Sequence, residues 1–366
     1  MGALRDILGR FGPGYWQRYG ARMPQSHARA LFDLQACGTH AMGGHTAACE
    51  DCGHAQFVPH SCRNRLCPGC HGAAIANWTA ARAGELLPVP YFHVVFTLPS
   101  ELRAVSRSHQ RELLGGLFPA AAEAMQTLAT DRLGGRLGMI ACIHTWGRNL
   151  IWHPHLHMLV PGVAVGADGT YAPLPPGFLL PVTALSEVFR AIYLRLARRA
   201  VPETPSAPWS KKWVVNCRPC LEGPVNVLRY LARYARKCPL AEDQILDYDR
   251  ARVRFRHKDH RTGRTTTCTL APDEFLRRLL QHAPPWGFHR VRYYGFLAPG
   301  ARRTLRSLQL ALRRGMAALA PAIARLREPS ERRRPLACER CGGTRLRHFD
   351  FRAPRRVRAP PVLGAA

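Results

Sequence analysis

Residues 138–161 read GMIACIHTWGRNLIWHPHLHMLVP, and this stretch decides the fold. Residues 138–146 and 155–161 have the length and apolar content of strands, and they are close enough in sequence to pair as antiparallel neighbours. Because side chains alternate along a strand, His155 and His157 share one face while Leu156 points into the core. Two imidazoles on one face can bind one divalent cation, although two packed histidines remain an open alternative.

The ligand set and the nucleophile follow from the residues around this motif. His144, on the first of the two strands, supplies a third ligand if the strands pair, and His153 is its competitor. No Asp or Glu occurs between Leu133 and Ala167, which argues against nucleases that hold two metal ions with carboxylates. A site made of histidines offers no obvious base to activate water. We therefore expect a side chain to be the nucleophile.

The elements on either side alternate between helices and short strands. We expect a buried strand at 91–98, helices at 108–130 and 183–200, a strand at 212–217, and strand pairs near 244–257 and 265–270. This order predicts an α+β fold, with a central antiparallel sheet and flanking helices, rather than a doubly wound parallel sheet. It divides the chain into a helical lead-in (1–35), a metal-binding module (36–88), a catalytic domain (89–299) and an arginine-rich helix and tail (300–366).

A helix expected from Pro224 to Lys237 supplies the candidate nucleophiles. Tyr230 and Tyr234 are one turn apart, about 6 Å along the axis, so both face one site. Lys237 falls on the same side, and three arginines flank it on the other: Arg229, Arg233 and Arg236. A cationic setting favours both the phenolate and the phosphate that it attacks. Two packed core tyrosines are the alternative.

Six of the thirteen cysteines lie between residues 37 and 70, which indicates metal ligation. Cys49-x2-Cys52 and Cys67-x2-Cys70 are fourteen residues apart, and paired knuckles at this spacing predict one zinc ion held by all four thiolates. A second zinc would take the remaining candidates Cys37, His45 and Cys62, with His40, His54 and His60 as spares. The pairs Cys217-x2-Cys220 and Cys338-x2-Cys341 have no visible partners; either could be half of a zinc site, but we favour the interpretation that they are unrelated to metal.

The charge of the chain indicates a polyanionic partner. Lysine plus arginine outnumber aspartate plus glutamate by 53 to 24, a net charge of +29. The excess is mostly arginine, which suits bidentate phosphate recognition and favours nucleic acid over a membrane surface. Arg63 and Arg65 lie between the zinc ligands, where a metal-fixed backbone would direct them at DNA; a purely structural clip is the alternative.

Residues 1–20 lack the apolar core and cleavage site of a signal peptide, and no apolar run is long enough to span a membrane. We expect a soluble, cytoplasmic protein.

Several motifs, in this order, resemble those of one family: the zinc knuckles, SCRNRLCPGC (61–70), PVPYFHVVFTLP (88–99), HTWGRNLIWHPHLH (144–157) and YLARYARK (230–237). From Cys37 to Leu297 the chain resembles the two-tyrosine rolling-circle transposases of bacterial insertion sequences. These belong to the histidine-hydrophobe-histidine (HUH) endonuclease superfamily.

The resemblance implies a mechanism. His155 and His157 would bind magnesium or manganese, and Tyr230 and Tyr234 would attack single-stranded or hairpin DNA at the element ends. Each attack leaves a 5′-phosphotyrosine and a free 3′-hydroxyl, while one or two structural zinc ions hold the module. A plasmid replication initiator or relaxase of the same superfamily is an alternative. So is a zinc-dependent nucleic-acid-binding regulator without catalysis.

Overall fold

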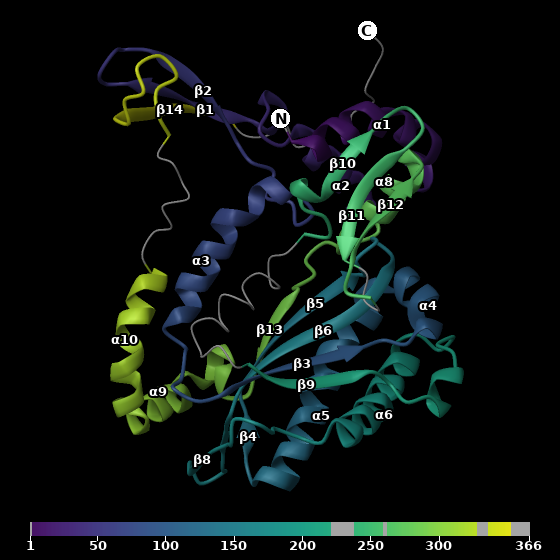
Figure 1. The fold of residues 1–366 in the computed structure, drawn as a ribbon, viewed down its shortest axis with the longest axis vertical. Coiled ribbons are helices and arrows are strands. Elements are labelled where there is room, and N and C mark those ends of the chain that lie inside the picture. The colour runs from purple at the N-terminus through teal and green to yellow at the C-terminus, as the bar shows by residue number, and fades with distance from the viewer. Residues whose placement is uncertain (1, 221–237, 259–261, 328–335, 353–366) are drawn as a thin grey trace.

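A five-stranded sheet forms the centre of the molecule (Figure 1). The computed structural model describes residues 2–220, 238–258, 262–327 and 336–352. Neighbouring strands all pair antiparallel, in the order β13 (Val291–Tyr294), β5 (Met139–Trp146), β6 (Trp152–Pro161), β3 (Tyr91–Thr97) and β9 (Val215–Cys220). The expected α+β class with a central antiparallel sheet is confirmed.

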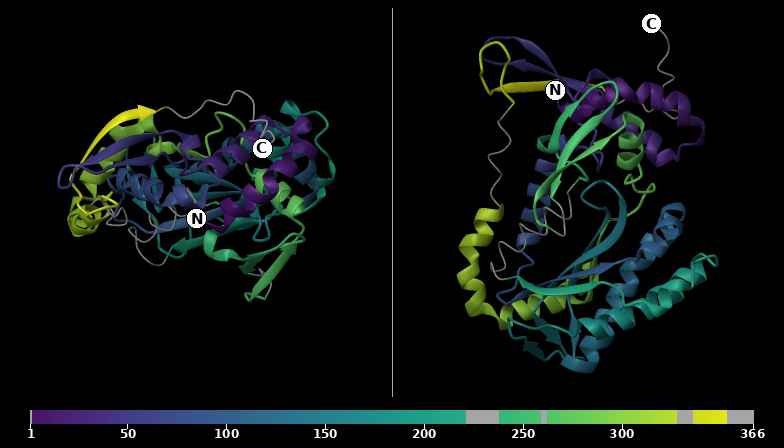
Figure 2. Two further views of the ribbon diagram at one scale, coloured as in Figure 1. Left: turned by 90° about the horizontal axis from the view of Figure 1, so that it is seen from above. Right: turned by 45° about the vertical axis from the view of Figure 1, so that its right-hand side comes forward.

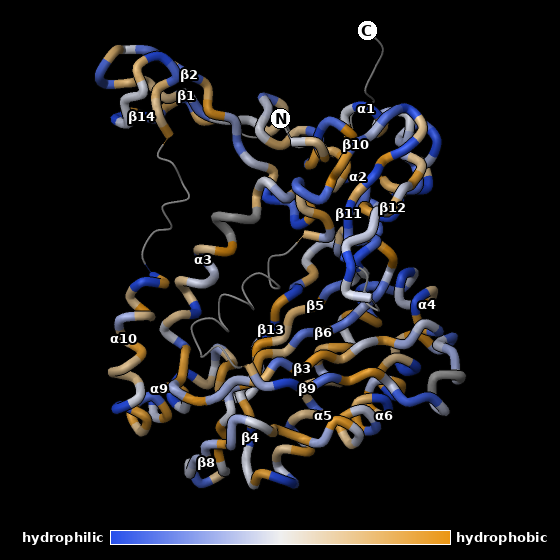
Figure 3. Tube along the Cα trace, in the orientation of Figure 1, coloured by the Kyte–Doolittle hydropathy of each residue, from blue (hydrophilic) through white to orange (hydrophobic). Residues whose placement is uncertain are grey.

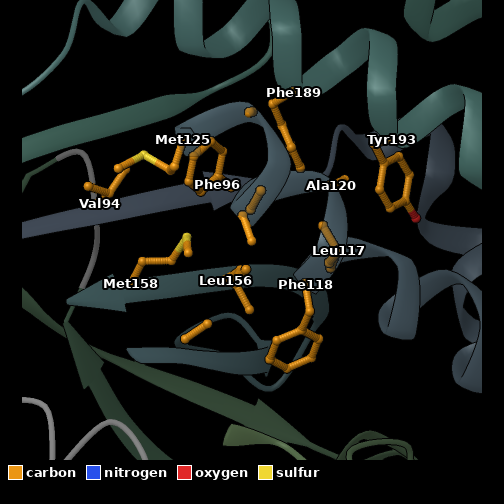
Figure 4. Packing of buried hydrophobic residues seen from close by; sticks show 14 of the residues in the cluster. Val94, Phe96, Leu117, Phe118, Ala120, Met125, Leu156, Met158, Phe189 and Tyr193 are labelled. Carbon is orange, nitrogen blue, oxygen red and sulfur yellow. The ribbon is translucent and has the colours of Figure 1, made fainter. Parts of the chain in front are cut away.

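One face of this sheet packs on helices α5 (Gly115–Leu133) and α6 (Val182–Ala200). Figure 4 shows the contact, in which Leu156 of β6 lies near Phe118 of α5. Burying alternate residues of each strand supplies the main hydrophobic driving force for this layer. The same alternation turns His155 and His157 to the opposite face.

The opposite face is covered at one end by α3 (His71–Ala83), α9 (Arg302–Ala311) and α10 (Arg313–Arg327). Trp78 and Leu308 pack there against Ile140 and Leu159 of the sheet. The helix expected after residue 300 is thus two helices, with Leu312 between them, and its apolar side is buried against α3 and the sheet. Figure 3 shows how apolar residues follow the central strands.

A second layer joins the two N-terminal helices to a segment distant in sequence. Helices α1 (Ala3–Tyr19) and α2 (Gln25–Ala36) share a buried cluster with α8 (Pro272–Leu280) and strand β11 (Val253–Lys258), including Leu8, Leu31, Phe255 and Phe275. The layer also contains a small sheet of β10 (Ile245–Tyr248), β11 (Val253–Lys258) and β12 (Thr265–Leu270). The lead-in is therefore packed onto residues 240–283, within the expected catalytic domain.

The cysteine-rich module is a three-stranded sheet in the order β14 (Leu346–Arg352), β1 (Gly44–Cys49) and β2 (Ala55–Pro59). Figures 1 and 2 show the yellow C-terminal strand lying beside the N-terminal hairpin. The expectation of a C-terminal tail is wrong for residues 346–352, because their backbone pairs with β1. This pairing between the two ends of the chain has no local sequence signal.

The remaining elements are short. Helix α4 (Arg103–Ser108) precedes a π-helical turn at Gln110–Leu114, and β4 (Arg136–Leu137), β7 (Val163–Val165) and β8 (Tyr171–Pro173) form a small sheet beside the main one. The helix expected from Pro224 to Lys237 lies outside the described residues. In the part of the chain that is described, no helix has both the length and the hydrophobicity required to cross a bilayer.

Candidate functional site

Three histidines of strands β5 and β6 converge on the face of the central sheet that points away from α5 and α6. Strand register places His144 of β5 directly opposite His155 of β6, with His157 two residues further along the same strand. One ring nitrogen from each lies within 4.8 Å of the other two. His144 and His157 are buried, while His155 is partly exposed. The sheet therefore builds a three-imidazole site without any contribution from loops.

The ring orientations are fixed by neighbouring groups. The Nδ1 atom of His155 lies 2.7 Å from the backbone carbonyl of His153 and must donate to it, so the neutral ring presents Nε2 as its lone-pair nitrogen. The ring of His144 is stacked on Trp146, with centroids 4.4 Å apart. Burial lowers the pKa of His155 to about 4, which keeps the ring neutral and able to bind a metal at physiological pH.

His93 of β3 contributes a contact that sequence reasoning missed. Its Nε2 atom forms a 2.9 Å hydrogen bond with Nδ1 of His157, and the two rings are stacked. Burial lowers the pKa of His93 to about 4. A group that forms a hydrogen bond with one nitrogen of a metal-binding imidazole leaves the other nitrogen to face the ion. The signal in the sequence was a lone histidine within an apolar strand, YFHVVFTL, which by itself indicates packing.

His153, the competitor of His144, does not join the cluster. Its Nδ1 atom lies 3.3 Å from a guanidinium nitrogen of Arg103. Arg103 also lines an open cleft of about 400 Å³ beside the start of β6, together with Arg107, Arg277 and Arg278. Both Arg277 and Arg278 pair with Glu274, which leaves Arg103 and Arg107 as the arginines of this cleft without a described carboxylate contact. The cleft thus presents positive charge next to the strand that carries the histidines.

The cysteines form two separate clusters of four, and the prediction that Cys49, Cys52, Cys67 and Cys70 share one ion is wrong. The first cluster joins the Cys67 knuckle to Cys37 and Cys62, and its Sγ atoms are 3.6–3.7 Å apart in the closest pairs. It borders the core of α1, α2 and α8 through the buried Cys67. The second cluster joins the Cys49 knuckle to Cys338 and Cys341. The spacing suggested that the two knuckles share one ion, but the fold places each knuckle beside cysteines from a different part of the chain.

Among the residues whose side chains the structure describes, no histidine joins either cysteine cluster. His45 lies instead against His60, with ring nitrogens 3.3 Å apart, and stacks on Phe351 of β14. His40 stacks on Phe57, 4.2 Å between centroids. His45 was a predicted second-zinc ligand, and the structure places it among aromatic rings of the module.

Of the residues predicted to contact DNA, Arg63 and Arg65 lie in the part of the chain that the structure describes. Arg63 is exposed, and its backbone is left-handed, with φ of 52°. The loop that presents it is anchored by Asn64, whose side chain donates to Asp33 and accepts from the amide of Leu66. Arg65 follows in the same loop. Six predicted residues lie outside the described residues: Tyr230, Tyr234, Arg229, Arg233, Arg236 and Lys237.

Comparison with known proteins gives the class of this chain. Residues 138–304 match a family model described as "Putative transposase", and residues 7–98 match a model described as "Transposase zinc-binding domain". A protein of Sinorhizobium fredii named "Putative transposase y4qJ" is 40% identical over 318 residues, covering 80% of each chain. A transposase for an insertion sequence element of Pseudomonas savastanoi pv. phaseolicola is 29% identical over 291 residues, covering 72% of this chain and 68% of its own. No solved structure matches the chain.

The two family models cover the histidine sheet and the N-terminal part of the cysteine-rich module. The chain therefore belongs to the insertion-sequence transposases that carry an N-terminal zinc-binding domain. The family expected from the motifs, the rolling-circle transposases, is confirmed.

Proposed function

We propose that this transposase cuts and rejoins single-stranded DNA by tyrosine transesterification, with one divalent ion bound at the histidine cluster. The observation that carries the proposal is the convergence of His144, His155 and His157 from two paired strands. A preformed triad of imidazoles on a rigid sheet suits a metal site that must act on a phosphate without rearranging. The three residues would hold the ion.

The donor set fits an ion that accepts nitrogen ligands. Neutral imidazoles suit transition metals, whereas magnesium prefers oxygen ligands. No carboxylate is present from Leu133 to Ala167, so manganese fits these residues better than magnesium. When bound, such an ion would stabilise negative charge on the scissile phosphate.

The reaction conserves the number of phosphoester bonds. The hydroxyl of Tyr230 or Tyr234 forms a bond to the phosphorus, and the bond from phosphorus to the 3′-oxygen breaks. The phenolic proton is lost, and the departing 3′-oxygen gains a proton. Because the new phosphotyrosine keeps the ester bond, a later 3′-hydroxyl can reverse the step and rejoin the strand without ATP. The resemblance of YLARYARK to the family motif supports this assignment.

The chain's positive charge supports a role in holding the DNA. The cleft that contains Arg103 and Arg107 lies beside the strand of His155, and we assign it to the phosphates of the substrate strand. Arg63, exposed on the zinc-binding loop, is assigned to recognition of the element end.

The cluster of Cys37, Cys62, Cys67 and Cys70 holds the zinc of the matched domain in this proposal. Its sulfur separations are close to the edge of about 3.8 Å expected for a ZnS₄ tetrahedron.

The test is formation of a covalent adduct. The protein is incubated with single-stranded oligonucleotides from the flanks of its own gene, with manganese, magnesium or a chelator, and adducts are resolved on a denaturing gel. We expect an adduct that requires the ion and forms faster with manganese. Tyr230→Phe combined with Tyr234→Phe keeps the rings and should bind DNA without an adduct. Binding without any adduct by the wild-type protein would favour a non-catalytic regulator.

A further inference from the structure

The second cysteine cluster joins the two ends of the polypeptide. Cys49 and Cys52 lie at the end of β1 and in the turn after it, and Cys338 and Cys341 lie in the loop that leads into β14. The Sγ atoms of Cys49 and Cys341 are 3.6 Å apart, as are those of Cys52 and Cys338. All four sulfurs lie within 4.8 Å of one another.

These separations match a metal site rather than disulfides. A zinc ion with four sulfur ligands at about 2.3 Å requires S···S edges of about 3.8 Å. A disulfide requires sulfurs about 2.05 Å apart. The observed distances are close to the first geometry for both pairs.

The backbones of the two knuckles have the same conformation. Gly53 and Gly342, each directly after the second cysteine, have φ of 70° and 75°, which only glycine adopts without strain. Each glycine amide donates to the carbonyl of the first cysteine at 2.9 Å. The amide of each first cysteine in turn donates to the carbonyl five residues later, at 2.9 Å for Cys49 and 2.8 Å for Cys338. Two segments distant in sequence therefore present their thiols in matching turns.

Further contacts hold the C-terminal segment in place. The side chain of the buried Gln56 donates to the carbonyl of Ala337 at 3.1 Å and accepts from the amide of Glu339 at 2.8 Å. Arg345 forms an ion pair with Asp51. These contacts are polar. No residue of β1, β2 or β14 belongs to any of the three buried hydrophobic clusters in the described chain. A sheet without a hydrophobic core of its own commonly depends on a metal for its stability.

We propose that Cys49, Cys52, Cys338 and Cys341 bind a second, structural zinc ion that makes the C-terminal segment part of the N-terminal module. The site goes beyond the matched zinc-binding domain, because residues 7–98 contain only two of its four ligands. It also goes beyond the proposed chemistry, since it does not depend on which residue attacks the DNA.

Zinc stoichiometry tests this site in the full-length protein purified without chelator. We expect two zinc ions per chain for the wild type, and one for the variant that combines Cys338→Ser with Cys341→Ser. Cys268→Ser, a partly buried cysteine outside both clusters, is the matched control and should keep two. One zinc in the wild type, or two in the double variant, would overturn the proposal.

A second measurement uses only the wild type, so misfolding of a variant cannot obscure the result. Cys341 is exposed, and its thiol should react readily with an alkylating reagent unless a metal protects it. We expect alkylation of Cys341, located by mass spectrometry, to become roughly tenfold faster after zinc chelation, because a metal-bound thiolate is withdrawn from reaction. An equal rate with and without chelator rules out the site.

Discussion

The histidine site and the cysteine-rich module are built in opposite ways. The three histidines lie within fourteen residues of sequence, on two strands whose other face is buried against α5 and α6. The ligands of the second cysteine cluster come from two segments far apart in the sequence and lie in turns beside a sheet that has no part in the described hydrophobic clusters. A core can position a site before the metal arrives, whereas a module without a core needs the metal to define its shape.

The largest expected effect separates chemistry from folding at the histidine site. His157→Ala should slow adduct formation by at least about a thousandfold, because the metal supplies several kcal/mol of charge stabilisation. Zinc content should be unchanged, since the cysteine clusters do not include this residue. The exposed His289→Ala is the control. A variant that retains wild-type cleavage would show that the ion binds elsewhere.

Zinc chelation tests whether the structure of the cysteine-rich module depends on its metal. Removing zinc should raise amide exchange in β1 and β14 by about a hundredfold or more, because local stability there depends on metal binding. Amides of β5 and β6 in the same sample should stay protected, since their strands are held by the core. Equal loss of protection in both regions would remove the contrast between them.

A smaller effect is expected at His93, which touches His157 rather than the substrate. His93→Leu should raise the manganese concentration needed for half-maximal adduct formation by about 10–100-fold, the usual range for partners of metal ligands. The loss should be recovered at high manganese. His93→Gln, which can keep a hydrogen bond to Nδ1 of His157, should be affected less. Equal effects of the two variants, without recovery, would indicate a packing role only.

The smallest effect concerns the arginine-lined cleft. Arg103→Ala combined with Arg107→Ala should weaken single-stranded DNA binding several-fold and reduce the slope of log affinity against log salt by about 1.4, corresponding to two lost phosphate contacts. Arg199→Ala, on α6 across the sheet, is the control. An unchanged slope would exclude the cleft from the DNA path.

The contrast between the two regions also explains what the sequence could predict. Alternation in residues 138–161 predicted the strand pair, the shared face of His155 and His157 and the position of His144, because each depends on short-range register. Cysteine spacing predicted metal binding but assigned the wrong knuckles to one ion. The contact between Cys52 and Cys338 depends on tertiary structure, and no local sequence pattern predicts it. His93 was missed for the same reason: its role appears only when β3 pairs with β6.

The pairing of β14 with β1 has a consequence for the timing of synthesis. Cys52 and Cys338 are separated by 286 positions, so the second cysteine cluster is complete only after residue 341 has been translated. At about 5–20 residues per second, the first two thiols wait roughly 15–60 seconds for their partners. A polypeptide released early would contain the histidine site but leave this module unfinished. Completion of the module therefore reports that translation has passed residue 341.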